Sequence, residues 1–129
     1  MMYAARILYP VKTLGPGDRV GIWLCGCSHG CPGCSNPELW SCGEQFRIPR
    51  ERLLQLVGSI AQGAEVNGFT ITGGDPLEQS EELALLLPEL RKISGDILVY
   101  TGYTLEQLRA MDSPAVESVL RNTSVLIDG

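Results

Sequence analysis

The chain has 129 residues, which suits one folded domain with its own core and is too short for a second. Its net charge is −5 and its lysines and arginines form no cluster, so nucleic acid is not an expected partner. No apolar stretch reaches the roughly 20 residues that span a bilayer, and the first residues lack the apolar region of a signal peptide, so we expect a cytoplasmic protein without membrane contact.

The first half of the chain predicts one strand, a long loop and one helix. Residues 19–24 (RVGIWL) form an apolar run after a Gly-Pro-Gly turn, which is typical of a buried strand. A loop that contains every cysteine follows and continues to about residue 45. Residues 50–62 place aliphatic side chains on one face, which predicts a helix with its apolar side toward the core.

The next segment predicts a strand, a helix and a second strand. Residues 68–72 (GFTIT) predict a short strand that ends at two glycines. Residues 80–93 repeat the helical spacing of apolar side chains, with a kink expected at Pro88. Residues 96–100 (DILVY) predict the strand that follows.

The last part of the chain predicts two short helices and a final strand. Thr104 and Gln107 match a capping box, so a helix is expected to begin after Thr104. Ser113-Pro114 predicts the start of a separate helix, because proline fits the first helical position. Residues 124–127 (SVLI) predict the last strand. Strands that alternate with helices at this spacing predict parallel β/α units.

The segments that directly follow the predicted strands carry the candidate functional residues. These segments are 27–34, 73–75, 101–102 and Asp128. Because the carboxyl ends of parallel strands meet at one edge of a sheet, we expect all four segments to lie together there.

Five cysteines lie in the first third of the chain, at Cys25, Cys27, Cys31, Cys34 and Cys42. The odd number and the expected compartment argue against a disulfide scaffold and favour metal binding. The middle three form a CxxxCxxC motif in a loop rich in glycine and proline. Three thiolates can ligate three irons of a 4Fe-4S cluster and leave the fourth iron open, whereas electron-transfer clusters usually take four cysteines.

Three alternatives for this motif stay open. A zinc site would need a fourth ligand, which His29 or Cys42 could supply. A thioredoxin-like redox pair would use the CPGC segment and leave the first cysteine of the motif without a role. A conventional four-cysteine cluster would recruit Cys25 or Cys42, although side chains at the spacing of Cys25 and Cys27 point opposite ways in an extended chain.

The segment Thr-Gly-Gly-Asp-Pro at the end of the second predicted strand admits two compatible interpretations. As turn chemistry, Asp75 caps a helix that begins at Pro76, with Glu78 at its third position. As a binding turn, Gly73 and Gly74 let a ligand approach the backbone, and Asp75 or nearby carbonyls accept hydrogen bonds from an ammonium group.

These motifs, in this order and at compatible spacing, resemble the radical S-adenosylmethionine (SAM) superfamily. The matching segments are Gly15-Pro-Gly-x-Arg19, Cys27-x3-Cys31-Pro-Gly-Cys34-x-Asn36-Pro-Glu, Thr72-Gly-Gly-Asp-Pro-Leu77, Tyr100-Thr-Gly-Tyr-Thr104 and Val125-Leu-Ile-Asp-Gly129. Within the superfamily, the chain most resembles the activating proteins of anaerobic ribonucleotide reductase.

The resemblance implies an α/β fold, a partial (β/α) barrel of parallel strands, as a single radical SAM core domain over residues 1–129. It implies that Cys27, Cys31 and Cys34 ligate a 4Fe-4S cluster whose fourth iron binds the methionine part of SAM. The residues that it places at SAM are Gly33, Ser35, Gly73, Gly74, Asp75, Thr101 and Asp128. No catalytic side chain is implied, because cluster and SAM carry the chemistry.

The activity implied by the resemblance is that of a glycyl-radical activase. Reductive cleavage of SAM would give a 5′-deoxyadenosyl radical that takes a hydrogen atom from a glycine of anaerobic ribonucleotide reductase. The implied partners are this large glycyl-radical enzyme and a flavodoxin- or ferredoxin-like electron donor. Two alternatives stay open, an activator of another glycyl-radical enzyme of the formate lyase type and a non-catalytic Fe-S or zinc binding protein.

The end of the chain departs from the pattern of this family. Family members continue past the Ile127-Asp128-Gly129 segment with a stretch that completes the site. Two explanations stay open, a truncated chain or a minimal member whose barrel a partner completes. In the second case an unprotected sheet edge would favour association.

Overall fold

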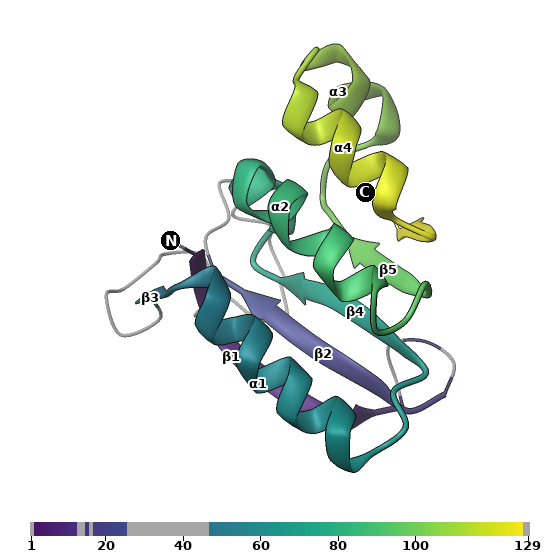
Figure 1. Ribbon diagram of the computed structural model, residues 1–129. Coiled ribbons are helices and arrows are strands. Elements are labelled where there is room, and N and C mark those ends of the chain that lie inside the picture. The colour runs from purple at the N-terminus through teal and green to yellow at the C-terminus, as the bar shows by residue number, and fades with distance from the viewer. Residues whose placement is uncertain (1, 13–14, 16, 26–46, 128–129) are drawn as a thin grey trace.

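The computed structural model describes residues 2–12, 15, 17–25 and 47–127. Within them, six strands form one sheet in the order β3-β1-β2-β4-β5-β6 (Figure 1). The strands are β1 (Met2–Val11), β2 (Arg19–Leu24), β3 (Arg47–Ile48), β4 (Gly68–Gly73), β5 (Ile97–Tyr100) and β6 (Val125–Ile127). The helices are α1 (Arg50–Gly63), the 3-10 helix η3 (Pro76–Gln79), α2 (Ser80–Arg91), α3 (Leu105–Ala110) and α4 (Pro114–Asn122).

Strands β2, β4, β5 and β6 pair in parallel, as their alternation with helices predicts. Ile22 of β2 pairs with Ile71 of β4, which pairs with Val99 of β5, which pairs with Leu126 of β6. All four predicted strands are therefore confirmed, with bounds that differ by at most a residue at either end. Their carboxyl ends lie at one edge of the sheet, where the candidate site was expected.

The other two strands correct the expectation of an all-parallel sheet. β1 pairs antiparallel with β2, with Ile7 opposite Ile22, and the short β3 pairs antiparallel with β1. The sequence analysis did not predict β1, because residues 7–11 (ILYPV) are apolar without polar alternation and contain a proline, which argues against a strand. The strand changes register twice, between Ala4 and Arg6 and between Leu8 and Val11.

The sheet is mixed and open across the described residues, with β3 and β6 as its two edges. Closure of a barrel requires the first and last strands to pair through a consistent tilt and stagger, and no such pairing joins β3 to β6 in this part of the chain. The structure thus establishes a mixed α/β sheet, and the partial barrel stays a prediction.

Helices α1 and α2 lie in front of the sheet in Figure 1 and bury their apolar faces against it. The core formed in this way contains Ile22, Ile71 and Val99 from the strands together with Val57 and Leu86 from the helices. This burial supplies the hydrophobic stabilisation that fixes the strand ends in place. No helix of the described residues is long and apolar enough to cross a membrane.

The predicted helix boundaries agree closely with the structure. Thr104 accepts a hydrogen bond from the backbone N–H of Gln107 (3.1 Å), and the Gln107 side chain accepts one from the Thr104 N–H (2.8 Å), which completes the capping box. Ser113 caps α4, and Pro114 is its first residue. Helix α2 runs from Ser80 to Arg91 with Pro88 inside it.

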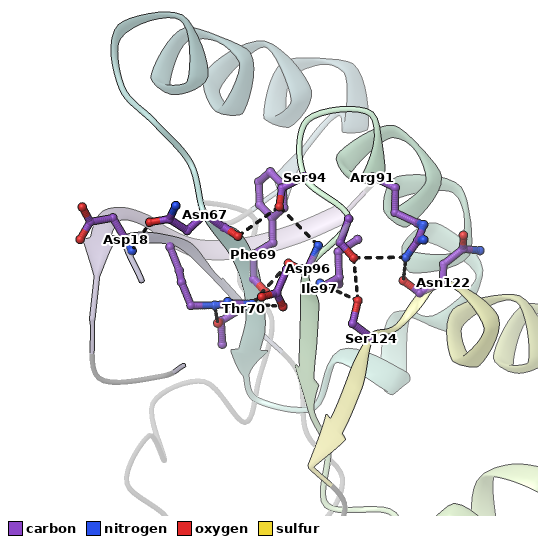
Figure 2. Close-up of polar contacts among 12 residues, drawn as sticks. Asp18, Asn67, Phe69, Thr70, Arg91, Ser94, Asp96, Ile97, Asn122 and Ser124 are labelled. Atoms are coloured by element: carbon purple, nitrogen blue, oxygen red, sulfur yellow. Dashed lines mark hydrogen bonds and ion pairs between the residues drawn. The ribbon is translucent and has the colours of Figure 1, made fainter. Parts of the chain in front are cut away.

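A polar network joins the amino ends of the parallel strands, at the edge opposite the candidate site (Figure 2). The fully buried Arg19 guanidinium donates from Nε to Oγ1 of Thr70 (2.8 Å) and from Nη2 to the carbonyl of Phe69 (2.7 Å). Its Nη2 also lies 3.2 Å from a carboxylate oxygen of Asp96. A Cβ at Gly68 would lie 2.6 Å from Arg19 Nη1, so glycine there makes room for the guanidinium. Arg19 therefore ties β2, β4 and the start of β5 together.

Candidate functional site

The carboxyl ends of β2 and β4 approach closely at Gly73. This residue has a φ of +115°, a conformation that side-chain-bearing residues rarely adopt, and a Cβ there would overlap the carbonyl oxygen of Leu24. The next amide, that of Gly74, donates to the Leu24 carbonyl at 2.8 Å. The two glycines thus allow the β4 turn to pack against the point where β2 ends.

The Asp75 carboxylate joins the ends of β4 and β5. It is 1% exposed and accepts hydrogen bonds from the Thr101 hydroxyl (2.8 and 3.0 Å) and from the Gly102 backbone N–H (2.8 Å). Its Oδ1 also accepts the N–H of Leu77 at 3.0 Å, which caps η3. Buried ionised groups require such partners, and here donors of the protein itself supply them.

Of the two interpretations of the Gly-Gly-Asp-Pro turn, the structure confirms the capping one. Asp75 is the N-cap of η3 and Pro76 is its first residue. The carboxylate is directed toward Leu77, Thr101 and Gly102, whose hydrogen bonds it accepts, and the binding interpretation stays a prediction.

Thr101 and the end of β6 continue the same edge. The Thr101 hydroxyl donates to Asp75 and accepts the N–H of Tyr103 at 3.2 Å, and the Thr101 backbone N–H donates to the Ile127 carbonyl at 3.0 Å. The expectation that segments 73–75 and 101–102 meet at one edge is confirmed. Asp128 follows Ile127 in the sequence but lies outside the described residues.

The other predicted site residues also lie outside the described residues. They are the three candidate cluster ligands Cys27, Cys31 and Cys34, together with Gly33 and Ser35. The alternative ligands His29 and Cys42 lie outside as well, whereas Cys25 is described and has a buried thiol that forms no disulfide. Its ligand role in a four-cysteine cluster stays untested.

Sequence reasoning missed Gln79, the last residue of η3. Its side-chain Oε1 accepts the N–H of Tyr3 (3.0 Å), and its Nε2 donates to the carbonyls of Tyr3 (2.9 Å) and Cys25 (3.0 Å). A prediction of strand β1 could have pointed to Gln79. A polar side chain at the end of a buried turn needs hydrogen-bond partners, and β1 is the neighbouring element that supplies them. Without β1 in the prediction, Gln79 looks like an ordinary polar residue at a helix start.

The donor chemistry of the sequence fits an iron–sulfur cluster. Cysteine thiolates are the usual ligands of a 4Fe-4S cluster, and three of them leave one iron for an exogenous ligand. Among the described residues, no group of three or more histidine, cysteine or acidic side chains gathers to hold a metal. The candidate metal site is the CxxxCxxC motif, on the thiolate chemistry of its sequence.

Comparison with known proteins gives a consistent family. The family model described as "4Fe-4S single cluster domain" matches residues 13–129. The anaerobic ribonucleoside-triphosphate reductase-activating protein of Pasteurella multocida is 34% identical over 94% of this chain and 79% of its own length. Proteins with the same name from Enterobacteria phage T4 and Escherichia coli K12 are 31% and 33% identical, covering 95% and 94% of this chain and 77% and 80% of their own.

Among solved structures, QueE from Escherichia coli has the same fold. It aligns with a TM-score of 0.66 over 81% of this chain and 54% of its own length. The sequences are 24% identical, so this likeness concerns the fold alone.

Proposed function

Because this chain belongs to the family of anaerobic ribonucleoside-triphosphate reductase-activating proteins, within the radical SAM superfamily, we propose that it is a SAM-dependent activase of an anaerobic ribonucleotide reductase. The observation that carries the proposal is the CxxxCxxC motif in a chain whose β4 and β5 ends meet at Asp75 and Thr101. A cluster loop and a binding turn are then expected at one sheet edge, as the family function requires.

In this proposal the chain supplies ligands and a binding surface. Cys27, Cys31 and Cys34 hold a 4Fe-4S cluster by three thiolates and leave one iron for the methionine group of SAM. When bound, cluster and SAM would supply one-electron reductive chemistry: an electron from the donor would break the C5′–S bond and release methionine, and a hydrogen atom taken from a reductase glycine would end in 5′-deoxyadenosine and leave a glycyl radical.

The described residues orient the SAM ligand. The backbone carbonyls of Gly73 and Gly74 accept hydrogen bonds from the ligand ammonium, and Asp75 holds this turn by binding Thr101 and Gly102. Asp75 thereby supports the binding turn, and it stays a proposed SAM-binding residue. Thr101, whose hydroxyl is directed to Asp75, supports the turn in the same way, while Gly33, Ser35 and Asp128 complete the proposed SAM site.

The proposed partners follow from the names of the relatives. These names favour a ribonucleotide reductase over a glycyl-radical enzyme of the formate lyase type. The electron would come from a flavodoxin- or ferredoxin-like donor.

The test is electron paramagnetic resonance of the anaerobically reconstituted, dithionite-reduced protein with and without SAM. We expect the signal of a reduced 4Fe-4S cluster whose shape changes when SAM is added. A cluster signal that SAM leaves unchanged would favour a non-catalytic Fe-S protein or a fourth protein ligand. Tightly held zinc without any cluster would contradict the proposal altogether.

A further inference from the structure

The side chain of Gln79 connects three chain segments that are distant in sequence. One amide group contacts the backbone of Tyr3 through both its oxygen (3.0 Å) and its nitrogen (2.9 Å), in the manner of a neighbouring strand. The second hydrogen of the same nitrogen is used on the carbonyl of Cys25 (3.0 Å). The amide therefore makes one accepted and two donated hydrogen bonds, to partners 76 and 54 positions away in the sequence.

This pattern requires an amide rather than a carboxylate or an apolar group. Its acceptor faces an N–H group, and its two donors face carbonyl oxygens, so that only one orientation of the amide satisfies all three. A carboxylate at this position would still accept from Tyr3 but would face two carbonyl oxygens without a proton to share. The local chemistry is thus specific for glutamine.

The Cys25 carbonyl is the last backbone group described before the cysteine motif, and Cys27 follows two residues later. Three hydrogen bonds fix the chain at this point. The Cys25 N–H donates to the Tyr3 carbonyl (3.1 Å), Gln79 donates to the Cys25 carbonyl, and Gly74 donates to the carbonyl of the preceding Leu24. Gln79 and Gly74 both belong to the segment that starts at the Gly-Gly-Asp-Pro turn.

We propose that Gln79 is a positioning residue for the cluster: by holding the Cys25 carbonyl, it fixes the end of β2, two residues before Cys27 in the sequence. The inference rests on the proposed function, because it takes Cys27, Cys31 and Cys34 as the cluster ligands. Contacts behind metal ligands commonly set how tightly a metal is held and at which potential it works. Through Gln79, the segment that carries the SAM-binding turn also supports the entry to the cluster motif.

The experiment compares Gln79→Glu and Gln79→Met with the parent protein, all reconstituted anaerobically. Gln79→Glu keeps the size and one acceptor but loses both donors, whereas Gln79→Met removes every hydrogen bond without adding charge. Three properties are measured: the rate of iron release to a chelator, the signal and midpoint potential of the reduced cluster, and amide hydrogen exchange of Cys25 in the cluster-free protein.

Two control variants separate a local effect from a loss of stability. Gln62→Glu makes the same chemical change at an exposed position in the last turn of α1. Ser124→Ala removes the hydrogen bonds of Ser124 with Ile97 and Gly95 at the opposite edge of the sheet, and so lowers stability away from the cluster motif. Denaturant unfolding places all variants on one stability scale.

We expect both Gln79 variants to release iron about tenfold faster than the parent, with a shifted cluster potential and faster exchange at Cys25. Gln62→Glu should keep the parent's values in all three measurements, and Ser124→Ala should keep the parent's iron release and cluster potential, with exchange at Cys25 faster only by as much as its lower stability accounts for. If the Gln79 variants show the same iron release, cluster potential and Cys25 exchange as Ser124→Ala at equal stability, Gln79 has only a structural role and the inference is overturned. If the parent protein itself binds no cluster, the proposed function fails, and this inference fails with it.

Discussion

The Asp75 carboxylate and the Thr101 hydroxyl form a buried hydrogen-bonded pair, 2.8 Å apart, between the carboxyl ends of β4 and β5. The two residues are 26 positions apart in sequence and lie just past the ends of neighbouring parallel strands. A charge-assisted hydrogen bond of this kind is stronger than a neutral one, and it is screened here from water. The pair therefore fixes the relative position of the two turns that form the proposed SAM site.

Substitution at this pair should reduce stability. Asp75→Asn removes the charge and turns one acceptor into a donor that faces the Thr101 hydroxyl or the Gly102 N–H. We expect a loss of about 2 kcal/mol in the free energy of unfolding, since the buried Thr101 and Gly102 donors lose their charged acceptor. Urea unfolding followed by circular dichroism measures this loss.

The coupling between the two residues should appear in a double-mutant cycle. Thr101→Val removes the hydroxyl donor, and the Asp75→Asn/Thr101→Val double variant should lose less than the sum of the single losses by about 1 kcal/mol. Thr101→Ser keeps the hydroxyl and serves as the control. Additive losses would show that the pair does not act as a unit.

Gly73→Ala should disrupt the contact between the ends of β2 and β4. The positive φ disfavours a side chain, and the added Cβ overlaps the backbone of Leu24. We expect a loss of at least about 2 kcal/mol in the free energy of unfolding.

Gly58→Ala is the matched control for this substitution. Gly58 lies inside α1, where an added Cβ meets nothing within 4 Å. Alanine there should raise stability by roughly 0.5–1 kcal/mol, because it favours the helix over the unfolded chain. Equal changes in the free energy of unfolding from Gly73→Ala and Gly58→Ala would contradict the close contact between Gly73 and Leu24.

Arg19→Met should destabilise the protein without changing the site at the other end of the sheet. The substitution leaves the Phe69 carbonyl and the Thr70 hydroxyl without the buried guanidinium, so we expect a loss of about 2–4 kcal/mol. Thermal or urea unfolding measures it. The reduced cluster signal of the folded variant should equal that of the parent, and a changed signal would place Arg19 in the functional site instead.

The assignment of Cys27, Cys31 and Cys34 as the three cluster ligands predicts that replacing one of them affects iron binding and that replacing another cysteine does not. Cys31→Ala should abolish cluster-derived iron and sulfide, because it removes one of three thiolate ligands. Cys42→Ala should leave both intact. Iron and sulfide content after anaerobic reconstitution measures the difference, and an equal loss from the two variants would overturn the assignment.

The sequence by itself determined the parallel half of the fold and the edge at which the site forms. The strands at 19–24 and 68–73 and the cap at Thr104 depend on periodicity and on residues a few positions apart, and such local signals survive without tertiary context. The motifs also indicated the family that the relatives confirm.

Tertiary structure decided how the candidate residues are used. The antiparallel pairing of β1 with β2 is established only in the folded sheet, and the carboxylate of Asp75 faces Thr101 only because β4 and β5 lie side by side. The contacts of Gln79 likewise join segments that only the folded sheet brings together. Hydrogen bonds between distant residues depend on strand order and register, which residue patterns along a single segment do not encode.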